Sequence, residues 1–197
     1  MKDSSLLAKF RMISVDRPGY GGSGKGKCIQ SIKEQTAMIA ECVAKYPHKK
    51  KIWVGHSFGG PIVARAAVDF PEQVSSVMML APAIDPENEK IFWIAHLARW
   101  KATKWLVPTS MKIAGEEKFS HVESLKEIEN DWDKVKVPIY HIHGEKDIIV
   151  PYANFQFSAD KFDDKYLVLK SLEKENHFLP WSRYDYIKHL LETDFID

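Results

Sequence analysis

Short apolar runs alternate with longer segments of helical periodicity along this chain. The runs predict strands at 11–16, 51–56, 75–81, 138–143 and 166–170. An alternation of strands with helices is typical of a mostly parallel sheet that carries helices on both faces. The pattern therefore predicts an α/β fold in a single domain that spans residues 1–197.

The helices between these strands have signals of their own. After the first strand, the positions that recur at helical spacing are Ile32, Gln35, Ile39, Cys42 and Val43. Pro47 and the lysines at 49–51 end that helix. A second helix follows Ser57 and stops near Pro71, and Pro180 is predicted to open a terminal helix.

The alternation breaks between residues 85 and 131, where no convincing strand occurs. This predicted helical insert carries a row of bulky side chains, namely Phe92, Trp93, Leu97, Trp100, Trp105 and Leu106. In one interpretation the row packs the insert onto the domain, and in another it lines an apolar pocket for an acyl or aromatic group. In a third, Trp93 and Trp100 with Lys101 or Lys104 contact a membrane surface.

Ser57 lies in the sequence Gly55-His56-Ser57-Phe58-Gly59, directly after an apolar run and before a helix-compatible stretch. A strand, Gly-x-Ser-x-Gly and a helix in this order form a nucleophile elbow, whose strained turn projects the serine hydroxyl above the sheet. The turn brings the residues two before and two after the serine together, so that only small residues fit there. We therefore predict a nucleophile at Ser57, with the Phe58 N–H facing any negative oxygen formed nearby.

A serine nucleophile requires a histidine base and an acid that orients this base. Asp147 follows the strand at 138–143, and His177 follows the strand at 166–170. Open α/β sheets place their sites at the carboxyl ends of the strands, so we expect Ser57, Asp147 and His177 to converge there. The competing residues are His56 for the base and Asp163, Asp164 or Glu175 for the acid.

Four motifs in this order resemble the α/β-hydrolase family. They are Asp16-Arg17-Pro18-Gly19-Tyr20-Gly21-Gly22-Ser23, the Gly-His-Ser-Phe-Gly-Gly elbow, the strand ending in His143-Gly144-Glu145-Lys146-Asp147, and Asn176-His177-Phe178. The resemblance runs from residue 11 to the carboxyl terminus. It implies a serine hydrolase of the esterase type, with a helical cap over the site in the insert at 85–131.

The resemblance also exposes a gap in the predicted sheet. Members of the family begin with further strands, and the third ends in a His-Gly turn whose loop supplies the second oxyanion N–H. Here only residues 1–10 precede the strand at 11–16, and the absent strand would lie between 11–16 and 51–56. The chain is then a fragment or a shortened product, or a neighbouring copy donates a strand, or the two flanking strands pair directly. Loss of one oxyanion donor slows acyl transfer about 100- to 1000-fold.

Composition limits the partners of the chain. Its 197 residues are 45% hydrophobic and 28% charged, and 28 basic against 27 acidic side chains give a net charge of +1. This balance gives no electrostatic case for nucleic acid or for an acidic membrane. The sequence shows no run of 18 apolar residues and no signal peptide, and Cys28 and Cys42 are not expected to pair. We expect a cytoplasmic chain without a membrane span.

Two other patterns imitate binding sites. Residues 19–26 satisfy Gly-x-Gly-x-x-Gly and nearly satisfy the P-loop pattern, but Gly26 replaces the required hydroxyl residue and Pro18 disturbs the strand-to-helix turn. His141 and His143 share one strand face and with Asp147 imitate a metal cluster, but no third histidine converges with them. We expect neither a nucleotide site nor a metal site.

These residues predict a hydrolase that cleaves a carboxylic ester, thioester or amide of a small molecule with an apolar group, and that needs no cofactor. Ser57 attacks the carbonyl carbon, His177 transfers the proton, and Asp147 orients His177. A serine in the elbow favours these substrates over epoxides and haloalkanes, which require a carboxylate nucleophile. The alternative is a noncatalytic or poorly active hydrolase-like fragment that acts in protein interaction, with a homo-oligomer or a donated strand filling the gap.

Overall fold

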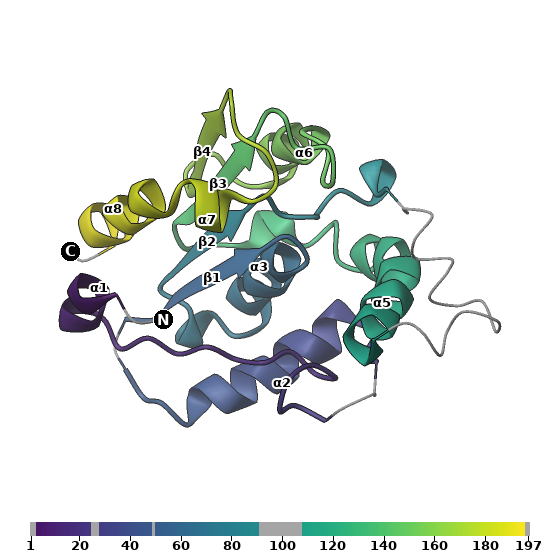
Figure 1. Ribbon diagram of the computed structural model, residues 1–197, viewed down its shortest axis with the longest axis horizontal. Coiled ribbons are helices and arrows are strands. Elements are labelled where there is room, and N and C mark those ends of the chain that lie inside the picture. Colours follow the sequence, from purple (N-terminus) through teal and green to yellow (C-terminus); the bar gives the residue numbers. More distant parts are fainter. Residues whose placement is uncertain (1–2, 25–27, 49, 91–107, 196–197) are drawn as a thin grey trace.

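The computed structural model describes residues 3–24, 28–48, 50–90 and 108–195 (Figure 1). Its sheet has four parallel strands in the order β1-β2-β3-β4, which span Ile52–His56, Ser76–Leu80, Ile139–Gly144 and Leu167–Leu172. The predicted α/β class with a parallel sheet is confirmed. These four strands lie within two residues of their predicted positions.

Helices connect the strands and cover the sheet. The α-helices of the described residues are α1 (Ser4–Lys9), α2 (Ile32–Ala44), α3 (Gly59–Asp69), α5 (Thr109–Lys126), α6 (Ala153–Lys161), α7 (Leu179–Ser182) and α8 (Tyr184–Asp194). Short 3-10 turns occur at Pro71–Gln73, Pro86–Asn88 and Trp132–Lys134.

The sheet separates two apolar cores. On one face α2 and α3 pack against Trp53, Val77 and Met79, and on the other face α7 and α8 pack against Met78 and Leu80 (Figure 1). All five residues of β2 are buried. A parallel strand that is covered on both faces requires this pattern, which explains the continuous apolar run in the sequence.

The helix predicted after the first apolar run forms as α2. The Ser31 hydroxyl caps it by accepting the Glu34 N–H at 3.3 Å. Ile32 and Ile39 are buried, as their spacing predicts, whereas Cys42 is exposed. Within the described chain, Cys42 and the half-buried Cys28 are both free thiols.

The prediction of a strand at 11–16 is wrong. Residues 11–17 form neither helix nor strand, and β1 is the edge of the sheet. An extended segment becomes a strand only when a neighbouring strand bonds its backbone groups, and no described strand lies beside this one. Direct pairing of 11–16 with β1 does not occur either, because β2 is the one described partner of β1.

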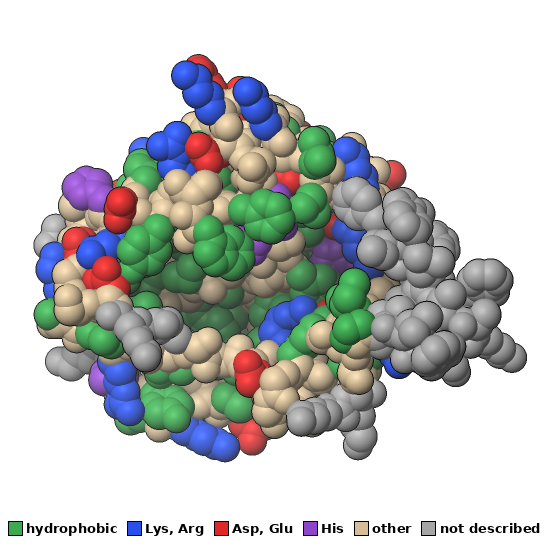
Figure 2. All heavy atoms as spheres, viewed as in Figure 1, with side chains coloured by type: hydrophobic (Ala, Val, Ile, Leu, Met, Phe, Trp, Pro, Cys, Tyr) green, Lys and Arg blue, Asp and Glu red, His purple; other side chains and the backbone are tan. Residues whose placement is uncertain are grey.

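The outer edge of β1 is open within the described part of the chain. The Lys51 carbonyl accepts the N–H of Ser75, just before β2, and the Ser57 N–H donates to the carbonyl of Leu80, at the end of β2. Successive residues of a strand direct their backbone groups to opposite sides, so the groups of every second residue between Lys51 and Ser57 face away from β2. Ile52, Val54 and His56 therefore direct their N–H and C=O groups away from the sheet, where none bonds to a described residue. The Val54 side chain is 47% exposed. Figure 2 shows that the molecule is hollowed where β1 lies, with hydrophobic side chains lining the hollow.

Two further predictions are refined. The terminal helix opens near Pro180, as predicted, but it divides into α7 and α8 because Arg183 leaves the helical conformation with φ −125° and ψ 33°. Of the insert at 85–131, α5 is described, whereas its row of bulky residues at 92–106 lies outside the described residues. The cap and its boundaries therefore stay a prediction. No helix in the described ranges has both the length and the apolar character of a membrane span.

Candidate active site

The Gly-x-Ser-x-Gly segment forms a tight turn between β1 and α3. Ser57 has a φ of 54°, in the left-handed region that non-glycine residues rarely adopt. A Cβ added to Gly55 would lie 2.2 Å from the carbonyl oxygen of Gly59, whereas a Cβ added to Gly59 would meet no atom within 4 Å. The strained turn agrees with the elbow geometry. Of its two glycines, only Gly55 has no room for a side chain.

Backbone hydrogen bonds join this turn to the last residue of β2 and to the segment that follows it. The Ser57 N–H donates to the Leu80 carbonyl at 2.9 Å, and the Ser57 carbonyl accepts the Ala83 N–H at 3.1 Å. The Phe58 N–H, at the start of α3, has no acceptor among the described residues. A free N–H at a helix start is a suitable donor to a negative oxygen.

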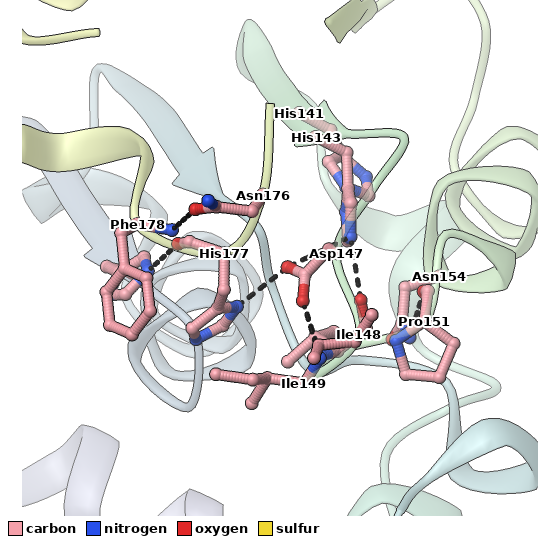
Figure 3. Close-up of polar contacts among 12 residues, drawn as sticks. His141, His143, Asp147, Ile148, Ile149, Pro151, Asn154, Asn176, His177 and Phe178 are labelled. Carbon is pink, nitrogen blue, oxygen red and sulfur yellow. Dashed lines mark hydrogen bonds and ion pairs between the residues drawn. The ribbon is translucent and has the colours of Figure 1, made fainter. Parts of the chain in front are cut away.

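Asp147 lies in the loop after β3, and its side chain is completely buried. Its Oδ1 accepts the N–H of Ile149 at 2.9 Å and that of Val150 at 2.8 Å. Its Oδ2 lies 2.7 Å from Nδ1 of His177 (Figure 3). Because an ionised carboxylate only accepts, the imidazole carries its hydrogen on Nδ1. The structure thus brings Asp147 and His177 together.

Backbone contacts hold the two loops against each other. The Lys146 N–H donates to the Glu175 carbonyl at 2.9 Å, and a Cβ added to Gly144 would lie 2.4 Å from the same oxygen. Glycine at position 144 therefore lets the loop of Asp147 approach the loop of His177.

The competing acids have other surroundings. Oδ2 of Asp163 lies 3.0 Å from Nζ of Lys136, and Oε1 of Glu175 lies 2.7 Å from Nε of Arg183. Asp164 is exposed. In the described part of the chain, none of these three carboxyl groups bonds to the histidine.

Burial and hydrogen bonding act in opposite directions on Asp147. Burial raises the pKa of the carboxyl, but hydrogen bonds from the imidazole of His177 and from the Val150 N–H outweigh it, so that the pKa lies below its usual value. The group is therefore ionised at neutral pH. Its charge lies where it stabilises a protonated imidazole.

His177 lies beside the elbow through its contact with His56. Nε2 of His56 donates to the carbonyl oxygen of His177 at 2.8 Å, and the two ring centroids are 4.6 Å apart. Burial lowers the pKa of His56. No hydrogen bond within the described residues joins the Ser57 hydroxyl to His177. Such contacts are often long in unliganded active sites.

The sequence did not predict a second cluster, which surrounds Phe58. The guanidinium of Arg17 lies 4.4 Å from the centroid of the Phe58 ring, and the centroid of the His121 ring lies 4.5 Å from it. Glu117 accepts two hydrogen bonds from Arg17, at 2.7 and 3.0 Å, and one from the Tyr20 hydroxyl at 2.7 Å. The only signal in the sequence was the Arg-Pro-Gly-Tyr order, because the partner in α5 lies 100 residues away.

The glycine-rich segment closes on itself. The Gly19 N–H donates to the Ser23 carbonyl at 2.7 Å, and the Gly22 N–H donates to Oδ2 of Asp16 at 2.9 Å. The next helix, α2, starts only at Ile32. The turn therefore does not lead directly into a helix start, which a phosphate site would use.

The two histidines of β3 bond to each other. Nε2 of His141 lies 2.9 Å from Nδ1 of His143, and both side chains are buried. Across the described ranges, no three His, Cys, Asp or Glu side chains are grouped as metal ligands.

An open cavity of 490 Å³ lies at the start of β1, at the opposite end of this strand from Ser57. Its lining residues are Ala44, Pro47, His48, Lys51, Glu72 and Gln73. It is therefore separate from the group formed by Asp147, His177 and the elbow.

Comparison with known proteins decides the family. A family model described as "alpha/beta hydrolase fold" matches residues 3–104, which is more than half of the chain. The chain belongs to the α/β-hydrolase fold family. The resemblance carried by its four motifs is thereby confirmed.

Curated relatives match part of this hydrolase-fold chain. It is 30% identical over 105 residues to a probable 1-acylglycerol-3-phosphate O-acyltransferase of Oryza sativa subsp. japonica, a match that covers 49% of this chain and 25% of that protein. It is 38% identical over 76 residues to a pimeloyl-[acyl-carrier protein] methyl ester esterase of Edwardsiella ictaluri, with 39% and 28% covered. The matched region thus spans about a quarter of the length of these relatives.

Solved structures share the fold at lower identity. The monoacylglycerol lipase of Paleococcus ferrophilus superimposes with a TM-score of 0.65 at 18% identity, covering 89% of this chain and 79% of that one. A lipase-esterase related protein of Clostridium acetobutylicum superimposes with a TM-score of 0.68 at 17% identity, covering 90% and 80%. These likenesses show the α/β-hydrolase fold alone.

Proposed function

We propose that this chain is a serine hydrolase that cleaves a carboxylic ester of a small molecule through an acyl-enzyme, with thioesters and amides as related substrates. One observation carries the proposal. A histidine that bonds a buried, ionised carboxylate at 2.7 Å contacts His56, the residue directly before a serine held at a φ of 54°. This is the pairing of base, acid and strained nucleophile that acyl transfer by serine uses.

In the proposed reaction, Oγ of Ser57 attacks the carbonyl carbon while Nε2 of His177 accepts the hydroxyl proton. Nδ1 of His177 donates to Asp147, which leaves Nε2 as the basic nitrogen. The tetrahedral intermediate then breaks its bond to the leaving oxygen, which takes the proton from His177. A water molecule that His177 deprotonates attacks the acyl-enzyme, releases the acid and restores the Ser57 hydroxyl.

The oxyanion of this intermediate needs donors, and we assign the Phe58 N–H as one of them. It begins α3 and has no acceptor within the described residues. The described part of the chain supplies no second donor that we can assign. With one donor of two, turnover is expected to be about 100- to 1000-fold slower than with a complete oxyanion hole.

We propose that the substrate carries an apolar group. Three exposed apolar side chains follow Asp147 or His177 in the chain, and they are Ile148 at 75%, Phe178 at 52% and Trp181 at 70% exposure. The rings of Phe178 and Trp181 lie in contact, with centroids 6.1 Å apart. The methyl ester esterases among the relatives favour a carboxylic ester.

A fluorophosphonate probe tests the activation of the serine. We expect the folded chain to be labelled, Ser57→Ala to abolish labelling, and Ser110→Ala, which removes an exposed hydroxyl in α5, to leave it unchanged. p-Nitrophenyl esters of increasing acyl length then measure the size of the pocket. An unlabelled wild-type chain with an intact circular dichroism spectrum would count against the hydrolase.

The open edge of β1 favours a second candidate function, that of a hydrolase-like module acting in protein interaction. The backbone groups of Ile52, Val54 and His56 bond to nothing in the described ranges. A strand donated by a second copy or by another protein would pair them. Light scattering over a range of concentrations tests for a second copy, and hydrogen exchange at the Val54 amide tests for any donated strand. This function is contradicted if the chain stays monomeric at every concentration and its Val54 amide exchanges hydrogen fast in the presence of every candidate partner.

We place either function in the cytoplasm. Cys28 and Cys42 are both free thiols, as is usual in a reducing compartment. Fractionation of cells that express the untagged protein is expected to recover it with cytoplasmic markers. Recovery in a secreted fraction would contradict this location.

A further inference from the structure

A buried chain of hydrogen bonds runs from α6 through β3 to Asp147. Nδ1 of His141 lies 2.8 Å from Oγ of Ser158, and Nε2 of His141 lies 2.9 Å from Nδ1 of His143. Nε2 of His143 lies 3.1 Å from the Val150 carbonyl oxygen. The same nitrogen lies 3.7 Å from Oδ2 of Asp147, the oxygen that bonds the proposed base (Figure 3). Both histidines are 0% exposed.

The last member of the chain decides the direction of every hydrogen. A carbonyl oxygen only accepts, so Nε2 of His143 carries a hydrogen. In a neutral imidazole the other nitrogen is then bare, so Nδ1 of His143 accepts from the Nε2–H of His141. Nδ1 of His141 in turn accepts from the Ser158 hydroxyl. All three hydrogens therefore point toward the Asp147 loop.

Burial favours the neutral form of both rings. It lowers the pKa of His141 well below its usual value, and the neighbouring His143 lowers it further. Burial likewise lowers the pKa of His143, assisted by His177 and opposed by the Val150 carbonyl and the Asp147 charge. A second proton on Nδ1 of His143 would also face the Nε2–H of His141. The neutral rings with both hydrogens on Nε2 are the state that these contacts accommodate.

We propose that His143 is a positioning residue for the Asp147–His177 pair, held in one tautomer by His141 and Ser158. Its N–H holds the Val150 carbonyl, and the N–H of Val150 holds Oδ1 of Asp147, so one short loop transmits the constraint to the carboxylate. The same N–H directs its positive end toward Oδ2. Only the kinetic test of this inference rests on the proposed hydrolase function.

The tautomers are measured without any substrate. In a two-dimensional ¹⁵N NMR spectrum of the histidine side chains, we expect His141 and His143 to be neutral with hydrogen on Nε2 from about pH 6 to 8. A His143 that carries its hydrogen on Nδ1, or that is charged at neutral pH, overturns the inference. This result holds whether or not the chain hydrolyses esters, so it separates a failure here from a failure of the proposed hydrolase.

Two substitutions measure the positioning. His143→Leu removes the donor and the acceptor, whereas His143→Gln keeps a donor for Val150 and an acceptor for His141. We expect the leucine variant to lower kcat about 10-fold at unchanged KM. In the pH profile of kcat/KM, the rise on the acid side (the acid limb) should move about half a pH unit lower in this variant, because a loosely held carboxylate stabilises the protonated base less. The glutamine variant is expected to keep both kcat and the acid limb at their wild-type values.

Ile142→Val is the matched control, because Ile142 is buried on the opposite face of β3. We expect it to lose stability without moving the acid limb. A folded leucine variant with wild-type kcat and acid limb overturns the inference, and so does a glutamine variant that behaves like leucine. If the leucine variant does not fold, the kinetics of the glutamine variant and the tautomers of the wild-type histidines still test the inference.

Discussion

The loops after β3 and β4 and the outer edge of β1 lie on two sides of the contact between His56 and His177, and they are built differently. On the first side, both oxygens of Asp147 have hydrogen-bond donors, and Gly144 lets the two loops touch. On the second side, the outward backbone groups of β1 have no described partner, and residues 11–16 form no strand. The carboxylate and the imidazole are thus tightly held, whereas the backbone of β1 beyond them has no described partner.

Asp147→Asn tests the tightly held side with the largest expected effect. We expect kcat for a p-nitrophenyl ester to fall about 10,000-fold, because an amide can donate to Nδ1 and turn His177 to the wrong tautomer. Asp163→Asn, at an acid that pairs with Lys136, should stay close to the wild type. A kcat for Asp147→Asn within tenfold of the wild type would show that this carboxylate does not orient the base.

Gly55→Ala tests the turn where the two sides meet. The added Cβ would lie 2.2 Å from the Gly59 carbonyl oxygen, so we expect the free energy of unfolding to fall by about 3 kcal/mol. Gly59→Ala adds the same methyl group where no atom lies within 4 Å, and it should change the free energy by less than about 1 kcal/mol. Urea unfolding measures both. Equal losses would mean that the turn relaxes around a methyl group.

Acid should weaken the packing behind Phe58. Burial lowers the pKa of His121 to about 4, whereas an unfolded histidine has a pKa of about 6.5. Between these values the unfolded chain binds the proton and the folded chain does not, so stability falls as the pH falls. His121 should cost about 2 kcal/mol of unfolding free energy between pH 7 and pH 5.

The control for this prediction separates His121 from the other histidines. Urea unfolding at both pH values should show that His121→Phe removes about 2 kcal/mol of the pH-dependent loss. His48→Gln, at an exposed histidine, should remove none. A His121→Phe variant that keeps the full pH dependence would show that this ring is protonated in the folded protein.

Val54→Thr tests the open edge and has the smallest expected effect. If the edge is open in solution, replacing the half-exposed Val54 should change the free energy of unfolding by no more than about 0.5 kcal/mol. Val77→Thr makes the same substitution at a fully buried position of β2 and should cost about 1–3 kcal/mol. A loss at Val54 as large as that at Val77 would show that a second copy or another strand covers the edge.

The sequence predicted four of the five proposed strands well because each begins as a short apolar run that pairs with a neighbouring parallel strand in the sheet. It was wrong at 11–16 because a strand needs a partner, and the composition of a segment does not say whether a partner is present. The candidate site shows the same division. Asp147 and His177 could be selected by their positions after strands, but His56, Arg17 and Glu117 could not, since their roles come from residues far along the chain.

By itself, the sequence determined the local features of this protein: the alternation of strand and helix, the tight turn that Gly55 permits, and the loops that carry Asp147 and His177. These depend on residues within one or two turns of the backbone, so a short stretch contains all the information. Only the tertiary structure decided which acid reaches the histidine, how the buried histidines of β3 are linked, and that β1 is left at an open edge. Hydrogen bonds and strand pairing join groups that are distant in sequence, and their partners are chosen by packing.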